Sequence, residues 1–370
     1  MTRTQAGTPL RTLYEAEIAS RGYAADAAQQ RAVERLEDLR GRLLRARTPG
    51  PLQRRLAALR QQALPATRGV YLCGGVGRGK TWLMDLFYDS IPFTHRRRSH
   101  FHHFMREVHT ELTRIRDRRE PLATVAARMA GRARVLCLDE LYVDDIADAM
   151  ILGGLFDHLL RRGVTLVLTS NVPPSGLYRD GLQRSRFLPA IALLESALEV
   201  LPVDGGVDYR LRQLRQARIY LDTADAAAPG RLQALYQQLA GEHGDPDSEL
   251  LISGRKVRAR RRSSDVVWFD FATLCAGARS QNDYIEIARD FHTVFLSDVP
   301  VLDEADNNAA RRFIALVDEL YDQGVKLVLS AAATPPRLYA GERLRFEFQR
   351  TQSRLIEMQS EEYLARAHRG

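Results

Sequence analysis

Three short stretches of the chain carry side chains whose types and spacing could bind and cleave a nucleoside triphosphate. The first, GGVGRGKT at residues 74–81, satisfies the phosphate-loop pattern G-x-x-x-x-G-K-S/T. Its glycines would let backbone N–H groups wrap the phosphates, Lys80 would reach the β- and γ-phosphates, and the Thr81 hydroxyl would bind Mg²⁺. The predicted nucleotide-binding residues of this stretch are Gly74, Gly75, Val76, Gly77, Arg78, Gly79, Lys80, Thr81 and Trp82.

The second and third stretches end two other apolar runs. VLCL at 135–138 leads into Asp139 and Glu140. Because neighbouring residues on a strand point to opposite sides, Asp139 could join the Mg²⁺ shell while Glu140 activates the attacking water. GVTLVLTSN at 163–171 ends in Asn171, whose amide could sense the γ-phosphate, although an asparagine at a strand end is commonly turn chemistry.

Arginines further along could complete such a site. Arg184 and Arg186 follow the third stretch, where oligomeric ATPases of the AAA+ kind present an arginine to the neighbouring subunit's γ-phosphate. An arginine finger accelerates hydrolysis roughly 10³- to 10⁵-fold, so activity would then depend on a homo-oligomer. We favour Arg186 for this role, and either arginine could instead be an ordinary surface residue. Arg210, with Arg212 in reserve, could fold over the nucleotide within the same chain.

These side chains need a parallel sheet whose strands end at one edge. Apolar runs that alternate with helix-like segments predict an α/β fold with such a sheet. We expect a helical N-terminal segment at 1–65, an AAA+-like P-loop core at 66–221 and a C-terminal α/β domain at 232–370. Residues 222–231, DTADAAAPGR, are typical of a linker.

The composition is that of a folded protein with more than one domain. The chain has 370 residues, of which 45% are hydrophobic. No run approaches the roughly 18 apolar residues of a membrane-spanning helix, and the N-terminus lacks an apolar signal core, so we expect a cytoplasmic protein. Cys73, Cys137 and Cys275 lie far apart within apolar runs, which indicates reduced, buried thiols.

Taken together, the residues resemble a known family, the ZapE cell-division ATPases and their mitochondrial relatives, the lactation-elevated (AFG-type) ATPases. The resemblance spans nearly the whole chain, and a small departure is Leu141, where the family usually has phenylalanine. It is carried by GVYLCGGVGRGKTWLMDLFY, HFHHFMREVH, VLCLDELYVDDIADAMIL, LTSNVPPSGLYRDGLQRSRFLPAI, DYRLR, FATLCAGARSQNDYIEIARDFHTVFLSDVP, RRFIALVDELYD and SRLIEMQSEEYL.

The resemblance implies an AAA+-type ATPase that uses ATP and Mg²⁺. In bacteria such a protein is associated with the FtsZ division ring and destabilises FtsZ polymers, which implies FtsZ as partner and recruitment to the division site. The resemblance also matches Asp26 and Gln29 to the family's D-x-x-Q. Gln29 could read the adenine amino edge with Tyr23 packing nearby, and a plain helix start with Asp26 as N-cap fits equally well.

A histidine-rich stretch invites a metal interpretation. SHFHHFMREVH reads as a strand through Met105, which would place His100 and His102 on one face and His103 on the other. His109 follows on the predicted helix, and no cysteine or acid is spaced to complete a zinc shell. We expect an edge that faces substrate or a neighbouring subunit rather than a metal site.

A second functional class, a nucleic-acid-dependent ATPase similar to a helicase loader, is suggested by the charge. The net charge is +8, and residues 255–262 form a basic cluster that could grip phosphates or an acidic tail. Such a run is also typical of a solvated hairpin, and no sequence-reading module for nucleic acid is visible.

The second half shows an echo of the first. TVFLSD, GVKLVLSA and PPRLY repeat RVLCLD, GVTLVLTS and PPSGLY about 160 residues later, which suggests a degenerate copy of the P-loop sheet or, alternatively, an extension of one sheet. In the copy, LCAGARSQ (274–281) would replace the phosphate loop, Asp298 would match Asp139, and Ala332 would replace Asn171. VLDEAD at 301–306 spells a helicase motif, but Pro300 precludes a central strand there, and we predict a loop.

Overall fold

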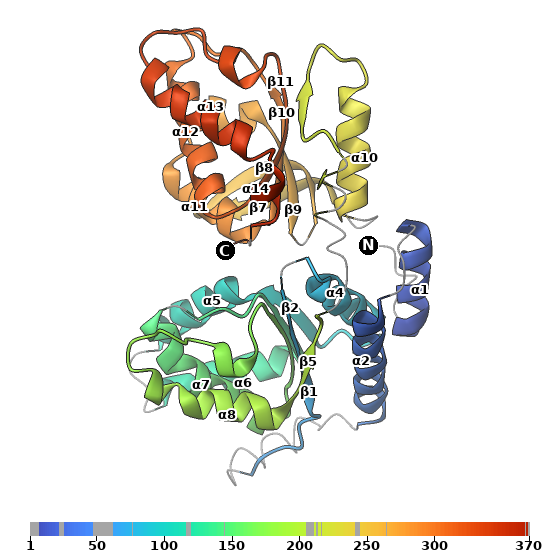
Figure 1. The fold of residues 1–370 in the computed structure, drawn as a ribbon. Coiled ribbons are helices and arrows are strands. Elements are labelled where there is room, and N and C mark those ends of the chain that lie inside the picture. The colour runs from blue at the N-terminus through green and yellow to red at the C-terminus, as the bar shows by residue number, and fades with distance from the viewer. Residues whose placement is uncertain are drawn as a thin grey trace. The chain divides into compact units, whose positions relative to one another are not determined.

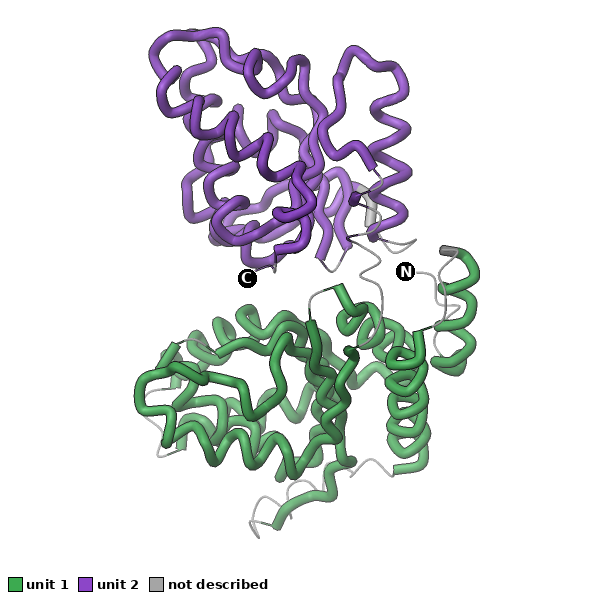
Figure 2. Tube along the Cα trace, viewed as in Figure 1, with its two compact units in different colours: residues 1–207 green, residues 208–370 purple. Residues whose placement is uncertain are grey.

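The computed structural model describes residues 7–21, 26–46, 62–75, 77–115, 120–143, 145–204, 211, 214–215, 217–240, 245–263, 265–366 and 368. The chain forms two compact units, Met1–Val207 and Asp208–Gly370 (Figure 2). Each unit has a sheet and hydrophobic cores of its own.

The sheet of the first unit has five parallel strands in the order β2-β3-β4-β1-β5. They are β1 (Gly69–Cys73), β2 (Arg96–His100), β3 (Val135–Asp139), β4 (Thr165–Ser170) and β5 (Leu198–Pro202). The central strands β1, β3 and β4 are buried along their whole length, as parallel strands are when helices cover both faces. The residues that follow these three strands therefore meet at one edge of the sheet.

Helices cover both faces of this sheet (Figure 1). On one face, α5 (Phe101–Arg114), α6 (Pro121–Arg132), α7 (Ile146–Arg161) and α8 (Leu188–Ala197) share a core with Leu136 and Leu168. On the other, α1 (Leu10–Arg21), α2 (Ala27–Arg45) and α4 (Lys80–Ser90) share a core with Cys137 and Val167. The alternative in which Asp26 is a helix N-cap is confirmed, because Asp26 accepts the N–H groups of Ala28 and Gln29 at 2.7 and 3.1 Å.

The sheet of the second unit has six strands in the order β6-β11-β10-β9-β8-β7. Its strands are β6 (Tyr220–Asp222), β7 (Asp245–Ile252), β8 (Arg255–Arg262), β9 (Val266–Asp270), β10 (Thr293–Val299) and β11 (Lys326–Ala331). The first four in this order run parallel, and β8 and β7 add an antiparallel hairpin. The helices are α10 (Ala228–Ala240), α11 (Gln281–Asp290), α12 (Asn307–Asp322), α13 (Arg345–Glu357) and α14 (Glu361–Leu364).

Two segments thus differ from the expected domain limits. β6 hydrogen-bonds to β11 of the second sheet, whereas the sequence assigned residues up to 221 to the ATPase core. α10 begins at Ala228, inside the stretch expected to be a linker. The Asp225 side chain explains this start, because it accepts the Ala227 N–H at 2.9 Å beside the first helical residue.

The second sheet repeats the first. The order β9-β10-β11-β6 matches β2-β3-β4-β1, and α12, like α7, has 16 residues and begins 161 positions later. Tyr71 in β1 donates a hydrogen bond to the Val172 carbonyl at 2.9 Å, and Tyr220 in β6 donates one to the Ala333 carbonyl at 2.7 Å. Val172 and Ala333 are also 161 positions apart. The two halves form separate sheets with one topology, which supports the predicted copy over an extended single sheet.

The structure corrects the register of this copy in two places. β9 lies in the position of β2, so LCAGARSQ (274–281) does not replace the phosphate loop, and residues 223–227 between β6 and α10 do. Leu138 pairs with Leu168 and Leu296 pairs with Leu329, so Ser297 matches Asp139 and Asp298 matches Glu140. The expected match of Asp298 with Asp139 was one residue off, because letter similarity favoured the aspartates over the strand register.

VLDEAD lies in the predicted loop, between the end of β10 and the start of α12. Glu304 of this loop accepts hydrogen bonds from the Asn307 side chain and the Arg343 N–H, at 2.8 and 3.0 Å. Residues 301–306 therefore form a loop that links α12 to the segment before α13, and they do not end a buried strand.

The basic cluster forms β8 of the antiparallel hairpin, and most of its charges are paired within the second unit. The ion pairs are Arg255–Asp283, Lys256–Glu249, Arg258–Asp247 and Arg260–Asp298. The Arg261 guanidinium lies over the Tyr236 ring, and Arg262 lies over Phe291. This arrangement favours the hairpin interpretation over a phosphate-gripping surface.

The three cysteines are free and buried, as predicted. Burial raises the pKa of the Cys137 and Cys275 thiols above the ordinary value, so both stay protonated at neutral pH. In the part of the chain that the structure describes, no helix has the length and apolar character needed to cross a membrane.

Candidate nucleotide-binding site

The glycine-rich loop connects β1 to α4 and has a backbone that other residues could not adopt. Gly74, Gly77 and Gly79 have φ values of 148°, 75° and 81°. A Cβ at Gly74 would lie 2.6 Å from Asp204 Oδ1, and one at Gly79 would lie 2.9 Å from Gln29 Nε2. α4 begins at Lys80, so the loop opens onto the positive end of a helix, where phosphates bind. Val76 lies outside the described residues.

The Lys80 ammonium group lies against the carbonyls of this loop. Its Nζ donates hydrogen bonds to the Gly74 and Gly75 carbonyls, both at 2.7 Å, and to Asn171 Oδ1 at 3.1 Å. Burial lowers the pKa of Lys80 to about 8, although Asp139 and Glu140 act in the opposite direction. The structure thus brings together Lys80 and Asn171, which lies directly after β4.

Asp139 ends β3 and is fully buried among donors from three elements. Its Oδ1 accepts from the Thr81 and Thr169 hydroxyls at 3.0 and 2.5 Å, and its Oδ2 accepts from Arg98 Nη2 at 2.9 Å. Burial acts to raise the pKa of Asp139, but Arg98, His100 and the two hydroxyls outweigh it and hold that pKa below its usual value. The carboxylate is therefore charged and oriented at neutral pH.

Glu140 follows Asp139 but does not continue the strand. It has a φ of 56°, and its N–H donates to Thr169 Oγ1 at 2.9 Å. We expected Asp139 and Glu140 to point to opposite sides because neighbouring residues on a strand alternate. That reason was wrong, because the backbone of Glu140 is in the left-handed region and the strand ends before it. The side chain is 32% exposed, with Oε2 lying 3.9 Å from His100 Nδ1. A buried acid and an accessible acid thus stand side by side.

Gln29 reaches the loop from α2. Its Nε2 donates to the Arg78 carbonyl at 3.0 Å, and its Oε1 accepts from the Tyr14 hydroxyl at 3.4 Å. The Tyr14 and Trp82 rings lie 5.4 Å apart, so α1, α2 and α4 meet beside the phosphate loop. In this structure Gln29 stabilises the phosphate loop through its hydrogen bond to Arg78. Tyr23, its expected companion, lies outside the described residues.

The candidate arginine fingers lie in a short 3-10 helix, Arg184–Arg186. The Arg184 Nη2 donates to the Ser175 carbonyl at 2.7 Å, whereas Arg186 is exposed. Phe187 anchors this segment in the core, and in the second unit the equally buried Phe348, 161 positions later, follows Glu347. Arg210 and Arg212 lie outside the described residues.

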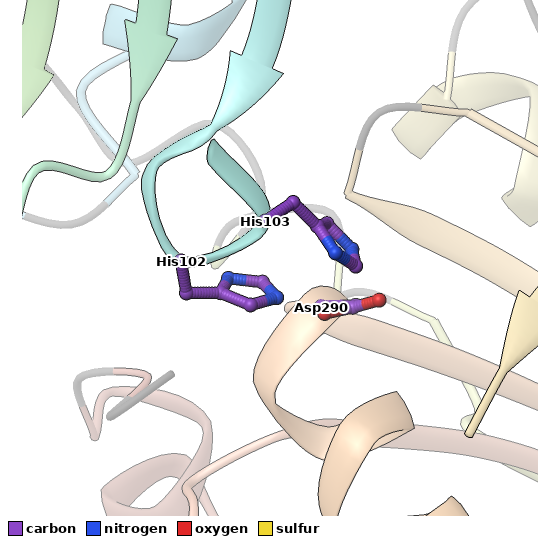
Figure 3. Close-up of side chains that lie close together, drawn as sticks. All are labelled: His102, His103 and Asp290. Atoms are coloured by element: carbon purple, nitrogen blue, oxygen red, sulfur yellow. The ribbon is translucent and has the colours of Figure 1, made fainter. Parts of the chain in front are cut away.

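The histidines do not follow the expected strand. β2 ends at His100 and α5 begins at Phe101, so His102 and His103 lie in the first turn of a helix (Figure 3). Their rings lie 4.2 Å apart, and His109 Nε2 lies 2.6 Å from Asp148 Oδ1 on α7. Asp290, also labelled in Figure 3, ends α11 of the second unit.

Sequence reasoning missed several residues that shape the site. Asp204 Oδ1 accepts the Gly75 N–H at 3.1 Å, Thr169 joins both acids, and Arg98 binds the buried one. No motif marks them. Arg98 stands in a run of three arginines, and only the pairing of β2 with β3 shows that its side chain meets Asp139.

The residues present fit a nucleoside triphosphate with Mg²⁺. The loop has the positive φ values at Gly74, Gly77 and Gly79 that a phosphate loop needs, and the Lys80 ammonium group lies against its carbonyls. The Thr81 hydroxyl and Asp139 carboxylate, 3.0 Å apart, are the oxygen ligands that Mg²⁺ prefers.

The sheet is parallel with the order β2-β3-β4-β1-β5, and it carries a phosphate loop after β1, two acids at the end of β3 and a polar side chain after β4. These features define a P-loop ATPase of the AAA+-like class. The model of the AFG1-like ATPase family matches residues 8–367. The chain therefore belongs to the AFG1-like ATPase family.

Two relatives agree with this assignment. The chain is 48% identical over 351 residues to the Cell division protein ZapE of Escherichia coli K12, a match that covers 93% of this chain and 94% of that protein. It is 36% identical to the Lactation elevated protein 1 homolog B of Danio rerio, covering 80% of this chain and 68% of that protein. Among solved structures, AMPPCP-bound DnaA from Aquifex aeolicus matches with a TM-score of 0.35 and 14% identity over 52% of each chain.

Proposed function

We propose that the chain hydrolyses Mg-ATP and uses the cycle to remodel a protein partner, which we identify as the FtsZ polymer of the bacterial division ring. The observation that carries the ATPase proposal is a set of two contacts at the edge of one sheet, in which Lys80 bonds to Asn171 and Thr81 bonds to Asp139. The FtsZ proposal is supported by the relatedness to the Cell division protein ZapE.

Each side chain has a part in the hydrolysis. Lys80 and the loop N–H groups hold the phosphates, and Asn171 contacts the γ-phosphate next to Lys80. Thr81 and Asp139 would hold Mg²⁺, which neutralises charge that develops on the phosphates. Glu140, accessible and outside the metal-binding pair, orients and deprotonates the attacking water.

The site is completed across a subunit boundary. Arg186 is exposed on a segment anchored by Phe187, which suits a residue that reaches a neighbouring subunit's γ-phosphate. We propose a cytoplasmic homo-oligomer, recruited to the division site, in which one subunit's turnover needs its neighbour.

The test is the ATPase rate with FtsZ polymer and, separately, with single-stranded DNA over a salt series. We expect FtsZ polymer to stimulate turnover, and ATP to lower the amount of polymer that sediments. Glu140→Gln is the control and should leave the polymer intact. Stimulation by DNA that fades with salt, with none by FtsZ, would instead favour the helicase-loader-like alternative.

A further inference from the structure

Arg98 lies at the centre of a charge cluster that no motif assigns. Its Nη2 donates to Asp139 Oδ2 at 2.9 Å, and its Nε donates to Asp85 Oδ1 at 2.5 Å. Asp139 is fully buried, and the Arg98 side chain is 17% exposed. The guanidinium therefore joins the strand that carries the metal-binding acid to α4, the helix that begins at the phosphate loop.

The two oxygens of Asp139 are divided between different donors. Oδ1 faces the Thr81 and Thr169 hydroxyls, and Oδ2 faces Arg98. A carboxylate held at both oxygens cannot rotate, so Oδ1 stays aimed at Thr81, the other expected Mg²⁺ ligand. Groups that orient metal ligands in this way set the affinity of a site.

The second unit supplies an internal comparison. Arg98 pairs with Cys137 in the first sheet, and Trp268 pairs with Phe295 at the same place in the second. Trp268 Nε1 donates to Ser297 Oγ at 3.2 Å, and Ser297 stands in the position of Asp139. In the second unit a neutral donor, Trp268, thus faces the hydroxyl of Ser297. In the first unit a cation, Arg98, faces the carboxylate of Asp139. A positive charge is therefore present at position 98 because Asp139 is an acid. The second unit shows that the fold itself needs only a neutral donor at this place.

We propose that Arg98 is a positioning residue of the ATPase site, which aims Asp139 toward Thr81 and thereby supports the Mg²⁺-dependent tightening of nucleotide binding. This inference rests on the proposed function. Loss of a group that orients a metal ligand typically costs about 10- to 100-fold in metal affinity, so Arg98→Gln should need about that much more Mg²⁺.

The experiment is equilibrium binding of a fluorescent ATP analogue in the Glu140→Gln background, with EDTA and over a Mg²⁺ titration. In EDTA the loop and Lys80 hold the nucleotide, so Arg98→Gln should bind like its parent. With Mg²⁺ the parent should tighten at a concentration about 10- to 100-fold lower than Arg98→Gln. Arg98→Lys, which keeps a charged donor, should recover part of the difference. Arg97→Gln, next on the strand and paired with Glu107, is the matched control and should follow the parent.

The outcomes separate the two proposals. A Mg²⁺ titration of Arg98→Gln that overlays the parent, or an equal loss of binding in EDTA and in Mg²⁺, would overturn the role of Arg98 while the parent still binds. If Arg98→Gln does not fold, Asp85→Asn is the second variant, because it removes the other carboxylate that holds the Arg98 guanidinium. It should shift the Mg²⁺ titration in the same direction as Arg98→Gln. No shift in this variant would overturn the proposal. A parent that binds no nucleotide overturns the proposed function, and the role of Arg98 with it.

Discussion

Asp298 occupies the same position in the second unit that Glu140 occupies in the first. Both have a left-handed backbone, with φ values of 63° and 56°, and the N–H of each donates to a hydroxyl of the neighbouring strand. Around Asp298 the chemistry differs, because its carboxylate pairs with Arg260 at 3.0 Å and Ser297 replaces Asp139, the proposed metal ligand. The turn is shared between the two units and the acidic pair is not.

Glu140→Gln should therefore lower turnover strongly even though the second unit keeps Asp298, the acid in the matching position. We expect ATPase activity to fall about 10²- to 10⁴-fold with nucleotide binding retained, because an amide cannot accept the water's proton. Lys80→Ala should lose binding as well. Steady-state phosphate release and nucleotide binding measure the two effects. Asp298→Asn is the matched control, and a comparable loss of rate in that variant would contradict the assignment.

Arg186→Ala should lower turnover about 10³-fold or more, with little effect on the binding of ATP. Mixing it with Glu140→Gln subunits should restore part of the rate, since an intact arginine on one variant can serve an intact acid on the other. Phosphate release against mixing ratio gives the answer. Arg184→Ala is the comparison, because that guanidinium is already bound to Ser175. A strictly additive mixture would mean that Arg186 does not act in trans.

Gln29→Leu should weaken the binding of ATP and GTP by a similar factor. In the structure Gln29 holds the partly buried Arg78 carbonyl, and an acceptor left without its donor costs about 1–3 kcal/mol, or roughly 5- to 150-fold in affinity. Competition binding with both nucleotides distinguishes this role from adenine reading. Gln30→Leu, on the exposed side of α2, serves as control. Loss of affinity for ATP alone would restore the expectation that Gln29 reads the base.

Asp283→Asn should destabilise the second unit at neutral pH and much less in acid. Burial acts to raise the pKa of Asp283, but the Ser280 N–H and Arg255 outweigh it, so the folded pKa lies below the ordinary 3.8. The stability that this charge contributes is fully present above pH 3.8 and is lost as pH falls through the lower folded pKa. The expected cost at pH 7 is about 1–3 kcal/mol.

Urea unfolding can be followed in the second unit alone. The chain has two tryptophans, so Trp82→Phe leaves Trp268 as the reporter of that unit. Glu249→Gln, which removes an exposed ion pair with Lys256, should change stability by less than about 1 kcal/mol. A difference in unfolding free energy between the parent and the Asp283→Asn variant that stays constant as the pH is lowered from neutral into the acid range would disprove the charge argument.

The parts of the site that one segment of chain defines were predictable from the letters. The phosphate loop needs glycines at fixed places before Lys80 and Thr81, and its neighbouring strand and helix are encoded beside it. Asp139 and Asn171 were found because each follows an apolar run, and parallel strands bring such ends to one edge.

Contacts between distant segments were not predictable in the same way. Arg98 and Thr169 reach Asp139 because their strands, β2 and β4, lie on either side of β3. The neighbours of a strand cannot be read from its own sequence. The same limit misplaced the phosphate-loop position in the second half, because β9 follows a hairpin and takes the place of β2. The helix that begins at Phe101 was expected as a strand, since alternating histidines suit both structures until the packing of Phe104 and Val108 decides.

Glu347 follows Arg186 by 161 positions, the same offset by which Ala333 follows Val172, and this change from a cation to an acid has a consequence for assembly. If Arg186 serves the neighbouring site, only the first unit of an adjacent copy can complete it, since a second unit would offer a carboxylate to a phosphate. An open row of copies would then always leave one terminal site without its arginine, whereas a closed ring would leave none.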